Sequence, residues 1–106
     1  RNISFLMDRK GAWRLSPAFD MVWAFNPDGR WTHRHQMSIH GKRVGFTLGD
    51  LEAPADEYDI RDAASIREEV SDAVAKWPEF ARLAEVDTKM SQAIGKTHLL
   101  GIISGK

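Results

Sequence analysis

The stretch "NISFLMDRKGAWRLSPAFD", residues 2–20, decides the fold of the first part of the chain. On either side of the polar "DRKG" the residues alternate and are rich in β-formers, which predicts a hairpin with strands Ile3–Met7 and Ala12–Leu15. Gly11 can supply the positive φ that a short hairpin connection often needs. Proline lacks the N–H that a strand ladder uses, so Ser16–Pro17 should end the second strand.

The two ends of this hairpin carry an amide and a carboxylate. If the turn centres on Arg9 and Lys10, paired positions sum to about 19, so Asn2 lies opposite Pro17. Asp20 follows three residues later, at most ~10 Å along an extended chain. Oxygens of these two types are the hard ligands that Mg²⁺ takes, with water and phosphate completing its octahedron. A strand-start Asn and a solvated turn Asp are also common, and that alternative stays open.

The rest of the first half predicts turns and a second short hairpin. "NPDG", residues 26–29, is a strong turn signal. "HQMSIHGKRVGFT", residues 35–47, favours short, partly exposed strands at Gln36–Ile39 and Arg43–Phe46, joined at Gly41.

From Thr47 the pattern becomes helical. Thr47 can cap a helix whose third position is Asp50, close to a capping box, and Pro54 should end or bend that helix. Asp59 or Asp62 should open the clearest helix of the chain. Its apolar residues recur at helical spacing and should be buried against the other helices, with Trp77 completing the stripe: Ile66, Val70, Ala73, Val74 and Trp77.

Two shorter helices should follow. Proline suits a first helical turn, so a helix is expected over Pro78–Ala84. Asp87 should cap the last helix, whose apolar stripe is Met90, Ala93, Ile94 and Thr97 to Leu100. The order predicts an α+β fold, in which short β-hairpins (residues 1–46) are followed by a helical bundle (residues 47–106).

Composition narrows the classes of function. At 106 residues with 42% apolar content, the chain has the size and core-forming residues of one domain. Residues 1–50 carry eight Lys and Arg against four Asp and Glu, and residues 51–106 carry seven against eleven. This asymmetry argues against a general nucleic-acid binder but permits a local phosphate-facing patch in the first half. No apolar run approaches a membrane span, and the absence of cysteine excludes disulfides and zinc–thiolate sites.

Two other groups of residues carry candidate chemistry. His33, His35 and His40 could begin a transition-metal site, although no carboxylate or thiol completes it, and ordinary surface histidines are the alternative. A basic cluster near the turns could contact phosphate or nucleic acid, or could simply be solvated: Arg30, Arg34, Lys42 and Arg43.

Three separated motifs, "RNISFLM", "GAWRLSPAFDMV" and "HQMSIHGKRVGFTLGDLEA", resemble the C-terminal half of the HipA-like serine/threonine kinases, which are toxins of bacterial toxin–antitoxin pairs. The resemblance is specific from residue 1 to about residue 55 and weaker in the helices that follow. It implies that residues 1–46 and 47–106 together form one partial HipA C-terminal kinase domain, part of a kinase-like C-lobe. It also implies a cytoplasmic location, without a membrane.

The resemblance also implies roles for individual residues. The family's catalytic segment is D-x-H-x-K-N-x-S, in which the Asp is the base and the Asn a metal ligand. Asn2 and Ser4 match its end, while Arg1 stands where Lys is usual. "LSPAFD" resembles the family's L-x-P-x-Y-D, whose acid chelates the catalytic Mg²⁺; Asp20 is that acid, and Phe19 replaces the commoner Tyr. In protein kinases such an Asn and Asp hold the metals that bridge the phosphates of ATP.

The family motif places the catalytic Asp ahead of Asn2, with four residues between them, so no catalytic base is expected within this chain. We therefore expect a C-terminal fragment of an ATP- and Mg²⁺-dependent kinase that is inactive by itself. The partners implied are an antitoxin of the HipB type, a protein substrate, and operator DNA mainly through the antitoxin. The alternatives are a non-catalytic interaction module, or a pseudokinase remnant that docks an antitoxin; Arg1 and Phe19 leave room for the latter.

Overall fold

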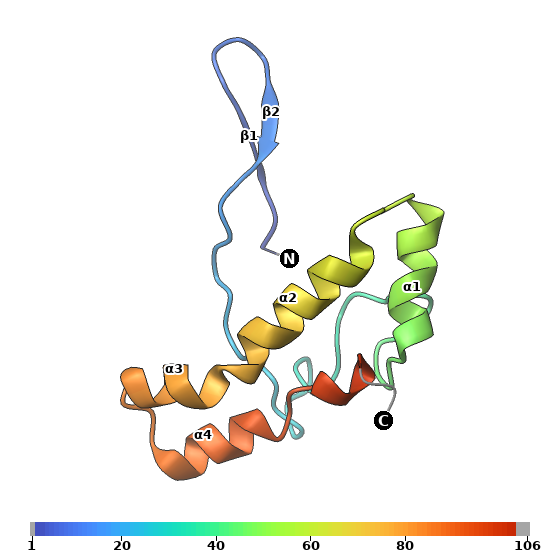
Figure 1. Ribbon diagram of the computed structural model, residues 1–106. Coiled ribbons are helices and arrows are strands. Elements are labelled where there is room, and N and C mark those ends of the chain that lie inside the picture. The colour runs from blue at the N-terminus through green and yellow to red at the C-terminus, as the bar shows by residue number, and fades with distance from the viewer. Residues whose placement is uncertain (1, 104–106) are drawn as a thin grey trace.

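The computed structural model describes residues 2–103, which form an antiparallel hairpin followed by four α-helices (Figure 1). Strand β1 is Phe5–Met7 and strand β2 is Trp13–Leu15. Gly11 adopts a φ of 83°, as the turn requires. The first hairpin and the α+β class are therefore confirmed, with strands shorter than the sequence predicted.

The register of this hairpin differs by one residue from the prediction. Phe5 pairs with Leu15 and Met7 with Trp13, so paired positions sum to 20 and Asn2 falls opposite Ala18 rather than Pro17. The reason lies in the turn, where the Asp8 carboxylate accepts hydrogen bonds from the backbone N–H groups of Lys10 (2.8 Å) and Ala12 (3.0 Å). These bonds close the loop symmetrically about Lys10.

The second predicted hairpin forms only its turn. Ile39 and Lys42 exchange backbone hydrogen bonds of 2.9 and 2.8 Å, and His40 and Gly41 between them both have positive φ, 47° and 76°. The predicted strands on either side are wrong, since the structure has a single isolated bridge there. Gly45 has a φ of 64°, which ends any extended backbone before it could continue the pairing.

Helix α1, Leu48–Glu57, begins as the sequence predicts and ends later. Thr47 is its N-cap, and the Asp50 carboxylate accepts a hydrogen bond from the backbone N–H of Thr47 at 2.7 Å, as in a capping box. Pro54 was expected to end or bend the helix; it lies inside α1 and does not end it. Proline removes its own N–H bond but can still accept one, and the N–H of Tyr58 bonds to the Pro54 carbonyl at 3.1 Å.

The next two helices divide at Trp77. Helix α2, Ala63–Ala75, follows Asp62, and helix α3, Trp77–Leu83, has its proline in the first turn as expected. Trp77 was expected to complete the stripe of α2, but it starts α3 because the chain turns at Lys76. Its indole packs instead against the last helix.

Helix α4, Thr88–Gly95, is capped as predicted, since the Asp87 side chain accepts a hydrogen bond from the backbone N–H of Met90 at 3.0 Å. The predicted continuation to Leu100 is wrong: the helix ends at Gly95, and a 3₁₀ turn, η1 (Leu100–Ile102), follows. Gly95 weakens the helix here, and the N–H of Thr97 bonds to the Ile94 carbonyl at 2.9 Å in a tighter turn.

Most of the predicted apolar stripe of α2 is exposed. Ile66 is 50% exposed and Val70 57% exposed, so the expectation that this stripe is core is wrong for both. The partly buried positions of the helix are Ala63, Arg67, Ser71 and Val74, of which only Val74 belongs to the stripe. At Ile66 and Val70 the described residues therefore leave about half of the surface uncovered.

The molecule is more open than its length suggests. Its accessible surface is 9222 Å², whereas a folded chain of this mass exposes about 6,000 Å². Its radius of gyration is 16.3 Å, against about 13 Å for a compact domain of this length. Figure 1 shows why, since the hairpin projects away from the helices. Within residues 2–103, no helix is long and apolar enough to cross a membrane.

Candidate metal-binding site

The open end of the hairpin brings together the two residues that the sequence singled out. The side-chain amide of Asn2 donates a hydrogen bond to the backbone carbonyl of Asp20, with 3.0 Å between Nδ2 and the oxygen. The contact spans eighteen positions of sequence and exists because the hairpin doubles the chain back on itself. Both residues are exposed, so small ligands have access to them.

Two serines hold the strand ends beside this contact. The backbone N–H of Ser16 bonds to the Ser4 carbonyl at 2.9 Å, and the Ser4 hydroxyl donates to the Ser16 hydroxyl at 3.0 Å. The Ser16 hydroxyl in turn donates to the Pro17 carbonyl at 3.0 Å. These bonds extend the pairing past β1 and β2, and so fix the spacing between the segments that carry Asn2 and Asp20. The sequence motif marks Ser4 but carries no signal for its hydrogen bond with the Ser16 hydroxyl.

Asp20 has an unusual backbone conformation. Its φ is 51°, in the left-handed region that few residues other than glycine adopt, although aspartate tolerates it better than most. The hydrogen bond from Asn2 engages its carbonyl and so supports this conformation. Among residues 2–103, no side chain forms an ion pair or hydrogen bond with the Asp20 carboxylate. The described residues therefore leave this carboxylate without a side-chain partner.

The chemistry of this pair suits a hard cation. With Nδ2 of Asn2 engaged, its Oδ1 remains as an acceptor, and the Asp20 carboxylate has no side-chain partner among the described residues. Such oxygens fit Mg²⁺, which often binds one or two protein oxygens and completes its octahedron with waters and phosphates. No cluster of three or more His, Cys, Asp or Glu lies within the part of the chain that the structure describes. A cation at this position would depend on ligands beyond those of residues 2–103.

The three histidines each have a different partner. Nδ1 of His33 lies 2.8 Å from the Gly29 carbonyl, and the His35 ring meets Phe46 edge-on at 5.3 Å. Nδ1 of His40 lies 3.1 Å from a carboxylate oxygen of Asp50. The described structure does not bring the three rings together.

The basic residues are also divided among local contacts. Lys42 forms an ion pair with Asp50, at 2.7 Å, and the guanidinium of Arg30 lies 4.8 Å from the ring centroid of Trp31. Two of the four basic residues, Lys42 and Arg30, therefore already contact other side chains of the protein. This makes the four less suited to binding phosphate together.

Asp50 is the polar residue whose importance the sequence showed only in part. Its side chain is 3% exposed and accepts hydrogen bonds from Lys42, His40 and both the backbone N–H and the hydroxyl of Thr47. The bond from Lys42, followed by those from Thr47 and His40, holds the pKa of this carboxyl well below its ordinary range. Asp50 fastens the turn at residues 39–42 to the start of α1. The capping pattern predicted its contact with Thr47 but gave no signal for the other two.

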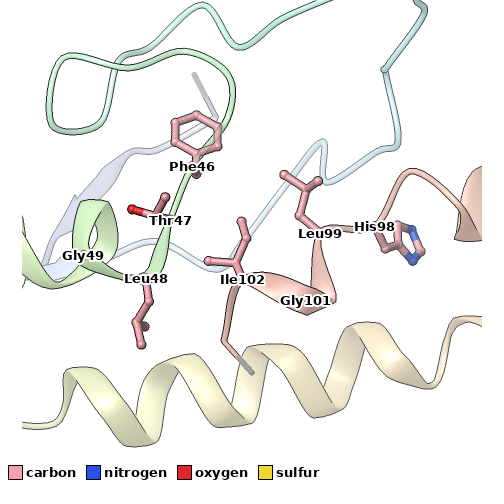
Figure 2. Close-up of a pocket in the computed structure, with 8 residues that line it drawn as sticks. All are labelled: Phe46, Thr47, Leu48, Gly49, His98, Leu99, Gly101 and Ile102. Carbon is pink, nitrogen blue, oxygen red and sulfur yellow. The ribbon is translucent and has the colours of Figure 1, made fainter. Parts of the chain in front are cut away.

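A hollow of about 610 Å³ lies elsewhere, between the start of α1 and η1. Figure 2 shows the residues that line it, most of them apolar: Phe46, Thr47, Leu48, Gly49, His98, Leu99, Gly101 and Ile102. Among the described residues that line it there is no carboxylate, and neither Asn2 nor Asp20 is among them.

The chain matches a known family over most of its length. Residues 1–78 match the model of the HipA-like C-terminal domain. The matched range contains the hairpin, α1 and α2, together with Asn2 and Asp20. Arg1, where the motif usually has Lys, lies outside the described residues. No curated protein and no solved structure matches the chain.

Proposed function

The chain belongs to the HipA-like C-terminal domain family, and from that premise we propose that Asn2 and Asp20 form the Mg²⁺-binding edge of a serine/threonine kinase active site. The complete kinase would transfer the γ-phosphoryl group of ATP to a protein hydroxyl. Residues 1–46 and 47–106 would together form one part of its C-lobe. Its location would be the cytoplasm.

One observation carries the proposal: the Asn2 amide bonds to the Asp20 carbonyl at 3.0 Å, and the Asp20 carboxylate has no partner among the described residues. A structural cap or a solvated turn would account for each residue separately. Neither role would require Asn2 and Asp20 to contact each other across the open end of the hairpin. Their meeting supports a shared role, and the family's motifs suggest which role that is.

The residues of this chain would act by position and charge. A Mg²⁺ ion held by Asn2 and Asp20 would supply positive charge to the phosphoryl group in transfer. Asn2 would use its Nδ2 to hold the Asp20 backbone and its Oδ1 to face the cation. Asp20 would supply the negative charge that retains the cation. The paired serines would keep the two ligands at a fixed spacing.

Other parts of the reaction would come from outside this chain. By the family's motif, the catalytic base lies five positions before Asn2, and the sequence contains neither a glycine-rich loop nor a phosphate-pairing Lys. We therefore propose that the 106-residue chain alone phosphorylates nothing. Its partners would be an antitoxin of the HipB type, a protein substrate and, through the antitoxin, operator DNA.

The experiment is a phosphorylation assay of the complete kinase with three variants. Asp20→Asn and Asn2→Ala should each lower kcat by about 100-fold or more, because each removes electrostatic support for the transferring group. Asp28→Asn is the matched control, since Asp28 is an exposed turn acid without an ion pair in the described structure. Full activity in Asp20→Asn would show that this acid is not a catalytic metal ligand.

A second candidate is a non-catalytic module that docks the antitoxin, and the exposed stripe of α2 favours it. In that case Ile66→Ser and Val70→Ser should weaken antitoxin binding, and the wild-type protein should show no phosphorylation under any metal condition.

A further inference from the structure

The segment from Pro17 to Phe25, which contains Asp20, has neither helix nor strand. Its neighbours Met21 and Val22 are strongly exposed, so packing does little to hold it in place. Beyond the bond from neighbouring Ser16 to the Pro17 carbonyl, side-chain hydrogen bonds join this segment to distant parts of the described chain at two residues, Asp20 and Trp23. These two contacts therefore help to hold it in place.

The second contact joins segments far apart in sequence. The indole Nε1–H of Trp23 donates a hydrogen bond to the hydroxyl oxygen of Thr97 at 2.9 Å, across seventy-four positions of sequence. Thr97 follows the end of α4 and lies beyond residues 1–78, the range that matches the family model. The contact thus connects the Asp20 segment to a part of the chain for which the family model makes no statement.

Thr97 is itself well anchored. Its hydroxyl donates a hydrogen bond to the Ile94 carbonyl at 2.7 Å, and its backbone N–H bonds to the same oxygen at 2.9 Å. Ile94 is one of the few buried residues, with 6% of its surface exposed. When one hydroxyl accepts a hydrogen bond and donates another, each bond strengthens the other. Trp23 is therefore connected through the Thr97 hydroxyl to the buried end of α4 at Ile94.

We propose that Thr97 is a positioning residue for the Asp20 cation site and that it acts through Trp23. Trp23 lies three residues after Asp20, at most ~10 Å along the chain. The bond from Asn2 holds the Asp20 carbonyl, but by itself it leaves the following chain free to swing and to turn the carboxylate with it. A second anchor at Trp23 removes that freedom. The inference rests on the proposed function, because it assumes that Asp20 binds the cation.

The test measures cation affinity in the complete kinase, with Mn²⁺ as a paramagnetic substitute for Mg²⁺ and ADP present, by electron paramagnetic resonance. Thr97→Val removes the hydroxyl at nearly constant shape, and Trp23→Phe removes the indole N–H. Thr97→Ser keeps the hydroxyl and is the rescue variant. Trp31→Phe is the matched control, because no hydrogen bond from the Trp31 indole is found in the described structure.

Thr97→Val and Trp23→Phe should each weaken Mn²⁺ binding by about two- to tenfold, as expected when the hydrogen bond between Trp23 and Thr97 is lost. The double variant should bind no more weakly than either single variant, and Thr97→Ser and Trp31→Phe should bind like the wild type. The indole ¹H–¹⁵N resonance of Trp23 should shift in Thr97→Val and stay in place in Thr97→Ser.

Wild-type Mn²⁺ affinity in folded Thr97→Val, measured below its melting temperature, would overturn the positioning role even if that variant melts earlier. If Thr97→Val does not fold, Trp23→Phe decides in the same way. Asp20→Ala separates the two proposals. Unchanged affinity in Asp20→Ala contradicts the metal site itself, whereas loss of binding there with no change in Thr97→Val contradicts only the role of Thr97.

Discussion

The indole Nε1–H of Trp77, the first residue of α3, donates a hydrogen bond to the backbone carbonyl of Ser91 in α4, at 2.9 Å. The ring also meets His98 edge-on, with 5.8 Å between centroids. Trp77 is half-buried and connects the last two helices to the turn that carries Thr97. The stability of this corner therefore depends on one side chain.

Replacing Trp77 should destabilise the protein in two steps. Trp77→Phe should lower the free energy of unfolding by about 1 kcal/mol, since it loses one hydrogen bond and retains most of the packing. Trp77→Ala should lower it by about 2 to 3 kcal/mol, less than for a fully buried tryptophan because the ring is only half-buried. Urea unfolding followed by circular dichroism measures both, and equal losses in the two variants would contradict a packing role for the ring.

Two isoleucines offer a matched test of the helical core. Ile94 is 6% exposed and Ile66 is 50% exposed, although both lie on predicted apolar stripes. Ile94→Ala should cost about 2 to 4 kcal/mol, whereas Ile66→Ala should change stability by no more than about 0.5 kcal/mol. A large loss in Ile66→Ala would mean that the stripe of α2 is buried in solution, against a copy or another part of the protein.

The Asp50 cluster should make stability depend on pH. The pKa of the Asp50 carboxyl is lower in the folded protein than in the unfolded chain, where it is about 3.9, so the ionised carboxylate stabilises the fold. That contribution is complete above about pH 5 and is lost as the pH falls through 4 toward the folded pKa. Asp50→Asn should therefore melt earlier than wild type at pH 7, and the gap should narrow below about pH 4.

Asp56→Asn is the control for this experiment, because Asp56 is an exposed acid of the same helix without an ion pair in the described structure. It should melt like the wild type at pH 7. A gap between Asp50→Asn and wild type that stays constant from pH 7 to pH 3 would contradict the role assigned to the ionised carboxylate.

The hairpin turn should be sensitive at Gly11, whose φ is 83°. A side chain in this conformation costs about 1 to 2 kcal/mol, so Gly11→Ala should speed amide exchange at Ser16 by about five- to thirtyfold. Gly49→Ala, in helix α1, is the control and should leave exchange in the hairpin unchanged. Unaltered amide exchange at Ser16 in Gly11→Ala would show that the turn does not limit how often the open end of the hairpin separates.

The features that the sequence predicted correctly depend on neighbouring residues. The two helix caps and the hairpin turn each involve residues close together in sequence, so their patterns could be recognised directly. The residues are Thr47 with Asp50, Asp87, and Gly11. The meeting of Asn2 and Asp20 followed from the same hairpin, although the register was off by one because the Asp8 side chain shapes the turn.

The features that the sequence could not predict depend on distant parts of the chain. The stripe of α2 is apolar at the right spacing, yet no described element covers Ile66 and Val70. The contact of Trp23 with Thr97 is set by the path of the whole chain between them, and neither residue type indicates a partner. Periodicity shows that a face is apolar but cannot show what packs against it.

The central claim, a cation held by Asn2 and Asp20, is tested most directly by adding Mn²⁺ to the wild-type protein and recording which nuclear magnetic resonance signals broaden. The account predicts that the side-chain amide of Asn2 and the backbone amide of Asp20 broaden first, and that Mg²⁺ in excess restores them. Broadening that begins at His33, His35 or Asp50 and leaves the signals of Asn2 and Asp20 sharp would contradict it.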